Sequence, residues 1–165
     1  MNNTIYFKNG GKQNTKETLL VVKEAIKTYK PEAVVIGTLS GQSALEAAKI
    51  LKNTNVRILA VPFQMNHWDK WGAPKKEIVI EAKSLGVEFI TNEPVVKSLD
   101  RNKPEITAAW RVVSRGFKVG IQCASMAVDT GMIEEGSTVI SLGGTKQGVD
   151  TAIVVHTYGY EKILE

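Results

Sequence analysis

Hydroxyl-bearing side chains gather between residues 38 and 43, directly after an apolar run that ends at Ile36. The run predicts a buried strand, and the alanine-rich segment after it predicts a helix. The first turn of a helix has backbone N–H groups without intrahelical partners and a partial positive charge, so it attracts anions. We therefore expect a phosphate or carboxylate to bind here. The candidate phosphate-binding residues are Thr38, Ser40, Gly41, Gln42 and Ser43.

A simpler interpretation gives the same residues no ligand. Serine hydroxyls commonly cap helices by accepting a hydrogen bond from a first-turn N–H group. Ser40 or Ser43 would then be the N-cap of an ordinary helix. The segment alone leaves anion binding and capping equally open.

An aromatic segment over residues 62–74 supplies a second group of candidates. It carries His67, Trp68 and Trp71, which we expect to contact a cofactor. An indole can stack on a planar ring, and it can equally pack against another subunit or fold back onto the sheet edge. Two tryptophans on a surface loop would form an apolar patch, and such patches usually have a partner.

A glycine-rich connection over residues 143–148 is the third candidate segment. Its glycines are expected to adopt positive φ or to bring backbone N–H groups close to a ligand. Asp150, directly after it, is expected to hold the loop through hydrogen bonds rather than to act in catalysis. The candidate cofactor-binding residues of this region are Gly143, Gly144, Thr145, Lys146 and Asp150.

Few other residues are suited to metal binding or acid–base chemistry. With two histidines and one cysteine, the chain predicts no zinc site of the usual ligand spacing. We interpret Cys123 as a core residue, His156 as structural, and Asp129 as a second carboxylate that holds a loop. No residue is assigned a catalytic role.

Apolar periodicity predicts strands that alternate with helices. Asn14 and Glu17 resemble a capping box at the start of the first helix. The last connection is too short for a crossover helix, so the final strand should run antiparallel to its neighbour. The pattern predicts one domain over residues 1–165, a three-layer α/β/α sandwich around a mostly parallel sheet. Strands are expected over 33–37, 56–61, 87–91, 138–142 and 152–155, and helices over 14–30, 42–52, 75–85, 106–116 and 119–132.

The three candidate segments each follow a predicted strand. In sheets of this kind, ligands bind outside the carboxyl ends of the strands. The segments should therefore converge on one edge of the sheet, which favours a phosphorylated ligand over simple capping.

Composition excludes several classes of protein. An apolar share of 43% with 23% charged residues is typical of a globular protein, and no apolar run has the length of a membrane span. The N-terminus predicts no signal peptide, and the single cysteine fits a reducing cytoplasm. The net charge of +4 comes from lysines spread among glutamates, so we expect no nucleic-acid partner.

The segment Gly37–Ala44 resembles the Thr/Ser-Gly-x-Thr/Ser-Ala segment of the pyruvate kinase C-terminal α/β domain. A closer similarity, over most of the chain, is to the free-standing pyruvate kinase alpha/beta domain proteins of archaea and bacteria. The resemblance implies a five-stranded mixed sheet with the last strand antiparallel. It also implies a pocket that holds a phosphate at 37–44, is closed by 143–148, and can take FMN. The matching segments are 14–19, 37–45, 118–119, 126–133 and 139–152.

Two classes of function are consistent with these features. The first is a binding module for a phosphorylated small molecule or a nucleotide such as FMN, which we favour because no acid–base pair is apparent. The second is an enzyme that uses such a ligand, for example a flavin-dependent oxidoreductase. Pyruvate kinase activity itself is not expected, because the catalytic barrel is absent. A homo-oligomer is compatible with either class.

Overall fold

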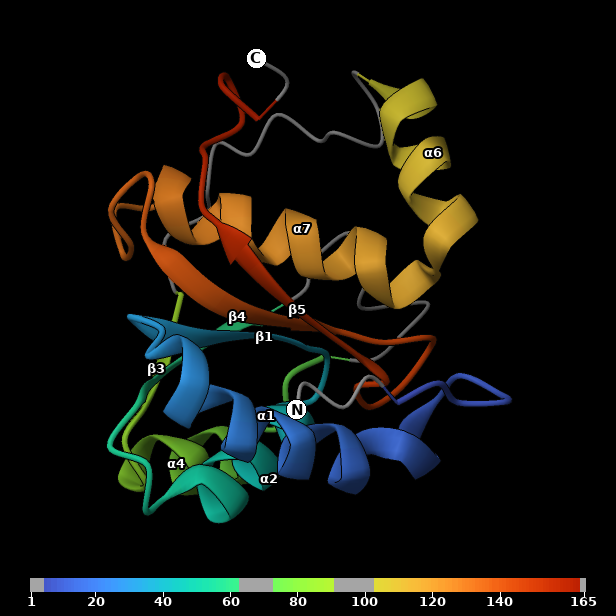
Figure 1. Ribbon diagram of the computed structural model, residues 1–165. Helices are drawn as coiled ribbons and strands as arrows, with labels where there is room; N and C mark the ends of the chain where they lie inside the picture. Colours follow the sequence, from blue (N-terminus) through green and yellow to red (C-terminus); the bar gives the residue numbers. More distant parts are fainter. Residues whose placement is uncertain (1–4, 63–72, 91–102, 164–165) are drawn as a thin grey trace.

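One mixed sheet organises the structure, a computed structural model that describes residues 5–62, 73–90 and 103–163 (Figure 1). Among these residues the strand order is β3-β2-β1-β4-β5. β1, β2, β3 and β4 run parallel, and β5 pairs with β4 in the antiparallel direction, as the short last connection predicted. The strands are β1 Ala33–Thr38, β2 Arg57–Pro62, β3 Val87–Phe89, β4 Thr138–Gly143 and β5 Thr151–His156.

Helices cover both faces of this sheet and complete a three-layer α/β/α sandwich, so the predicted fold class is confirmed. One face carries α1, α2 and α4, while α7 crosses the other face and α6 packs against α7 (Figure 1). None of the described helices combines the length and the apolar composition needed to cross a bilayer. The helices are η1 Lys12–Asn14, α1 Thr15–Tyr29, α2 Gln42–Leu51, α4 Lys76–Ser84, α6 Pro104–Val113 and α7 Arg115–Asp129.

The apolar core has two halves, one on each side of the sheet. Every residue of β1 is buried, because a parallel strand covered on both faces has no side exposed to water. Alternate residues of the strand therefore enter different halves. Val34 and Ile36 pack toward α1 and α2, whereas Ala33 and Val35 pack toward α7.

Glycines bring α7 unusually close to the sheet. A Cβ atom on Gly143, at the end of β4, would collide with the carbonyl oxygen of Gly116 in α7. A Cβ atom on Gly120, one turn further along α7, would lie 3.1 Å from the Ile153 side chain of β5. The start of α7, the carboxyl end of β4 and the amino half of β5 therefore fit together only because these positions lack side chains.

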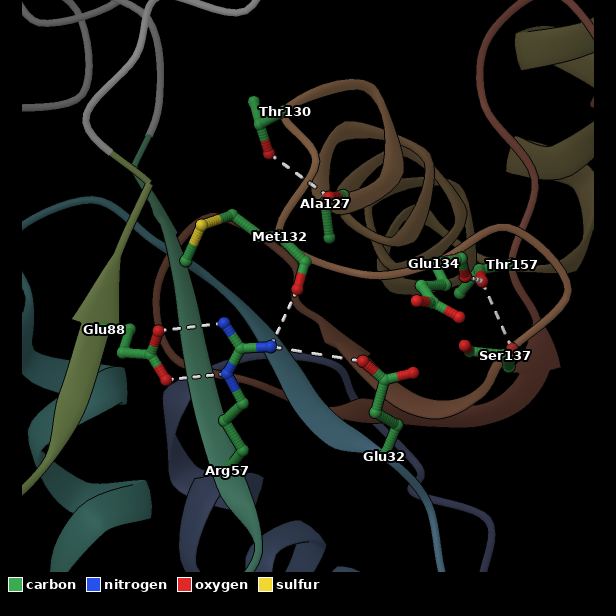
Figure 2. Close-up of polar contacts among 9 residues, drawn as sticks. All are labelled: Glu32, Arg57, Glu88, Ala127, Thr130, Met132, Glu134, Ser137 and Thr157. Carbon is green, nitrogen blue, oxygen red and sulfur yellow. Dashed lines mark hydrogen bonds and ion pairs between the residues drawn. The ribbon is translucent and has the colours of Figure 1, made fainter.

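A charged cluster joins the opposite, amino edge of the sheet (Figure 2). The Arg57 guanidinium donates to both carboxylate oxygens of Glu88, at 2.7 and 2.9 Å, and to the Met132 carbonyl oxygen at 2.7 Å. Glu32 lies 4.0 Å from the same guanidinium. The hydrogen bonds between Arg57 and Glu88 raise the pKa of the arginine and lower the pKa of the glutamate. This Arg57 cluster ties β2 to β3 and to the segment that leads from α7 into β4.

Two helix starts differ from the sequence prediction. Asn14 does not form a capping box, because it belongs to η1 with φ −90° and ψ −8°, a helical conformation that does not aim its side chain at the first turn of α1. Its side-chain amide donates to the Asn9 carbonyl oxygen at 2.7 Å instead. α7 begins at Arg115 rather than near residue 119, because the Ser114 hydroxyl caps it by accepting from the Phe117 N–H at 2.9 Å.

Candidate functional site

The sheet register places the starts of the three predicted segments at one edge. Thr38 at the end of β1 pairs with Pro62 at the end of β2, and Ile36 pairs with Leu142, one residue before Gly143. The convergence predicted from the strand order is therefore confirmed for the described residues. Residues His67, Trp68 and Trp71 lie outside the described residues, and the structure leaves their predicted contacts untested.

The loop before α2 uses its own hydroxyls to hold its backbone. The Thr38 hydroxyl accepts a hydrogen bond from the Gly41 N–H at 3.0 Å, and the Ser40 hydroxyl accepts one from the Gln42 N–H at 3.4 Å. Gly41 is the N-cap residue, with φ 93°, a left-handed conformation that favours glycine. The expectation that Ser40 or Ser43 is the N-cap is therefore wrong. The N-cap is Gly41, which lies between these two serines in the sequence.

Two donors of the first turn of α2 remain available. The first intrahelical bond runs from the Leu45 N–H to the Gly41 carbonyl oxygen, so the N–H groups of Ser43 and Ala44 precede the helical ladder. Within the part of the chain that the structure describes, neither N–H has an acceptor. Ser43 is 8% exposed and Ala44 is fully buried. Buried N–H groups are nearly always hydrogen-bonded, so this turn is suited to accept an anion.

A second helix start lies beside this turn, and its residues were not among the predicted site residues. The Lys75 N–H donates to the Ser40 carbonyl oxygen at 3.0 Å, which fixes the start of α4 against the loop. Lys75 and Lys76 are both exposed, and Glu77 follows them in the same turn. A lysine at a helix N-terminus is unfavourable by itself, whereas it favours an anion bound nearby. The adjacent pair of lysines just before an amphipathic segment was the signal available in the sequence.

Asp150 holds the glycine loop, as expected. Its carboxylate accepts from the Gly11 N–H at 2.7 Å, the Thr145 N–H at 3.0 Å and the Thr151 hydroxyl at 2.9 Å. One side chain thus joins the N-terminal segment, the loop over 143–148 and the start of β5. Because three protein donors already occupy this carboxylate, its role in the structure is to position the loop.

The conformations of the loop glycines agree with the prediction only in part. Gly148 has the expected positive φ, 72°, but Gly143 and Gly144 do not have positive φ. A Cβ on Gly144 would collide with the Gly148 carbonyl oxygen, just as one on Gly143 would collide with that of Gly116. The close approach that these glycines allow is therefore to the backbone of the protein itself. Lys146 is exposed in the same loop and has a left-handed φ of 67°.

The remaining candidates are structural in the described residues. The Asp129 carboxylate accepts from the Tyr160 N–H at 2.9 Å, and partial burial raises the pKa of this group. Cys123 lies in the core, where burial raises the pKa of its thiol to about 12. His156 Nδ1 lies 3.2 Å from the Thr138 hydroxyl of the neighbouring strand. Among residues 5–62, 73–90 and 103–163, no cluster of three or more possible metal ligands occurs.

A search of the chain against models of known protein families finds no match. The resemblance to the pyruvate kinase alpha/beta domain therefore remains a prediction.

Proposed function

We propose that this chain is a binding module for a phosphorylated small molecule or a nucleotide such as FMN, with the phosphate at the N-terminus of α2. The observation that carries the proposal is the pair of N–H groups of the buried residues Ser43 and Ala44, for which the described residues supply no acceptor. Two parallel N–H groups at the positive end of a helix suit the oxygens of a phosphate.

The surroundings of this turn support an anion rather than a neutral ligand. The hydroxyls of Thr38 and Ser40 accept hydrogen bonds from the loop, and neither donates its own proton to another described residue. The start of α4 adds the positive end of a second helix together with Lys75 and Lys76. Glu77 offsets part of that charge, so the backbone donors are the centre of the proposed site.

FMN enters the proposal through the resemblance to the pyruvate kinase alpha/beta domain. In this proposal the phosphate of FMN binds at the first turn of α2. The proposed contacts for its ring are His67, Trp68 and Trp71, which lie outside the described residues. A bound flavin would supply hydride-transfer chemistry. The alternative function is therefore an enzyme that uses the bound flavin.

Calorimetric titration with FMN and with riboflavin tests the phosphate site, because riboflavin has the same ring and no phosphate. We expect FMN to bind and riboflavin to bind at least tenfold more weakly. Ser43→Pro removes one of the two unpaired N–H groups at a position in the first turn where proline is tolerated. Beyond any loss from the missing hydroxyl, it should lower the affinity for FMN by about 1.5–3 kcal/mol, the range for a hydrogen bond to a charged group.

The matched control is Ser43→Ala, which removes the hydroxyl and keeps the N–H, and it should lose less affinity than Ser43→Pro. Circular dichroism checks that both variants fold. Equal binding of FMN and riboflavin would overturn the phosphate assignment, as would an unchanged affinity for FMN in Ser43→Pro. Bleaching of the flavin absorbance by a nicotinamide donor would identify an enzyme rather than a binding module.

A further inference from the structure

The N-terminal segment contains the one Asn-Gly pair of the sequence, Asn9 and Gly10, in the turn just before η1. Asparagine is one of the thermolabile residues of proteins. Its side-chain amide can be attacked by the backbone nitrogen of the residue that follows. Glycine hinders this attack least, because it has no side chain and adopts the widest range of conformations. The pair is therefore a candidate site of spontaneous chemistry, independent of the proposed phosphate site.

The structure leaves both reacting groups of this pair accessible. Asn9 and Gly10 are exposed, and among the described residues no hydrogen bond engages the Asn9 side-chain amide or the Gly10 N–H. The turn is held through its carbonyl oxygens instead. That of Asn9 accepts from the Asn14 side-chain amide at 2.7 Å, and that of Gly10 accepts from the Gln13 side-chain amide at 3.0 Å. The reaction therefore has no hydrogen bond of the attacking nitrogen or of the leaving group to break within the described residues.

The reaction at this pair consumes only water. The Gly10 nitrogen gives up its proton and bonds to Cγ of Asn9, while the side-chain nitrogen takes up a proton and leaves as ammonia. The product is a five-membered succinimide ring. Water then adds to one of the two ring carbonyls and breaks the bond of that carbonyl to nitrogen. Opening at Cγ gives aspartate, whereas opening at the backbone carbonyl gives isoaspartate, in which the chain continues through the former side chain.

The neighbours of Gly10 couple this chemistry to the fold. A Cβ atom on Gly10 would lie 2.8 Å from Oδ2 of Asp150 and 2.9 Å from Oγ1 of Thr145, so the turn packs directly against the glycine loop. The N–H of the next residue, Gly11, donates to the same Oδ2 at 2.7 Å. Isoaspartate lengthens the backbone before Gly10 by one methylene group, and the tight contact leaves little space for that shift. Either product also adds a carboxylate one residue from this contact, and like charges repel.

We propose that Asn9 is a site of spontaneous deamidation, and that isoaspartate at this position weakens the hydrogen bonds by which Asp150 joins the N-terminal segment to the glycine loop. The change runs in one direction, because the ammonia is lost and no step of the reaction restores the amide. A deamidated molecule keeps its sheet, whose strands lie elsewhere in the chain, and holds its N-terminal segment less firmly. The proposal does not depend on ligand binding.

Peptide mapping by mass spectrometry after incubation at mildly alkaline pH tests the chemistry. Asn53 and Asn55 are internal references, because both are exposed but precede β-branched residues. We expect Asn9 to exchange NH2 for OH roughly tenfold faster than these two, or more, since glycine follows it. A protein isoaspartate methyltransferase should label the product. The matched control is Asn9→Gln, which keeps an amide but cannot close the five-membered ring, and it should stay unlabelled. Conversion at Asn9 no faster than at Asn53 and Asn55 would overturn the proposal.

Hydrogen exchange on the deamidated chain tests the coupling to Asp150. Ion-exchange chromatography separates this form, because it carries one more negative charge than the unmodified chain. The amides of Gly11 and Thr145 both donate to Oδ2 of Asp150, so they should exchange faster in the isoaspartate form, while the amides of β1 should not change. Asn9→Asp adds the charge without the longer backbone and should show a smaller increase. Unchanged exchange at Gly11 and Thr145 in the isoaspartate form would overturn the proposed weakening.

Discussion

The amino and carboxyl edges of the sheet differ in whether their polar groups have hydrogen-bond partners within the described residues. At the amino edge, the Thr130 hydroxyl donates to the carbonyl oxygens of Met126 and Ala127 at the end of α7, and Arg57 binds Glu88 and the Met132 carbonyl oxygen. At the carboxyl edge, the N–H groups of Ser43 and Ala44 lack an acceptor among the described residues. One edge satisfies these polar groups within the protein. The other leaves two donors without an acceptor among the described residues, at the position where α/β proteins bind ligands.

The carboxyl edge nevertheless contains a rigid part. Gly143 packs against α7, and Asp150 accepts a hydrogen bond from the loop that follows β4. The turn at the start of α2, which follows the neighbouring strand β1, has N–H groups without an acceptor among the described residues. Two glycines at the carboxyl edge therefore have different roles. Gly41 shapes a turn whose N–H groups lack an acceptor among the described residues, whereas Gly143 permits close packing against α7.

The largest effect should come from Gly143→Ala, which tests whether this glycine serves packing. The added methyl would collide with the Gly116 backbone, which cannot move without displacing α7. We expect the free energy of unfolding to fall by about 3 kcal/mol, in the upper range for overpacking a core. Denaturant unfolding measures it.

Gly86→Ala is the matched control for this change. Gly86 has φ 87°, and no heavy atom lies within contact distance of the position that a Cβ would occupy. The added methyl therefore introduces only backbone strain, about 1 kcal/mol. If Gly143→Ala is no more costly than Gly86→Ala and instead abolishes ligand binding, the glycine loop belongs to the site after all.

Next in size are the substitutions Ser40→Ala and Ser43→Ala, which test the open turn. If their hydroxyls donate to a phosphate oxygen, each change should weaken FMN binding by roughly 1–3 kcal/mol with little loss of stability. Calorimetry measures the affinity. Ser84→Ala is the control, because Ser84 binds the Glu81 carbonyl oxygen at the far end of α4. Unchanged affinity in the Ser40/Ser43 double variant would mean that these hydroxyls serve only the loop.

The smallest effect is expected at the amino edge, from Arg57→Met. Arg57 and Glu88 are 35% and 42% exposed, so water screens the pair and its loss should cost only about 1 kcal/mol. Since Arg57 lowers the pKa of Glu88, the pair stabilises the protein above the ordinary glutamate pKa, and this contribution is lost as the pH falls through the lowered pKa.

Thermal unfolding between about pH 6 and pH 2 should therefore show a shallower acid loss of stability in Arg57→Met than in the unmodified chain. FMN affinity should not change, since the cluster lies at the opposite edge. A parallel loss of FMN affinity would contradict the separation of the two edges.

The sequence predicted the alternation of strands and helices and the direction of the strands, because the apolar periodicities alternate and the last connection is short. It also predicted Asp150 and Asp129 as residues that hold loops, because carboxylates beside turns readily accept backbone hydrogen bonds. Local patterns failed where neighbours distant in sequence decide the outcome. The role of Gly143 depends on α7, and the position of Lys75 beside Ser40 depends on how α4 packs. Asn14 failed for a local reason, a preceding 3-10 turn that no pattern indicated.

The hydrogen bonds of Asp150 and Thr15 have a consequence for the order of folding. The Asp150 carboxylate binds the Gly11 N–H across 139 positions of sequence, and the Thr15 hydroxyl accepts from the Val149 N–H across 134. Contacts of such long range form only after a large loop has closed. During synthesis, the segment around the start of α1 therefore cannot form these hydrogen bonds until residues 149 and 150 have left the ribosome.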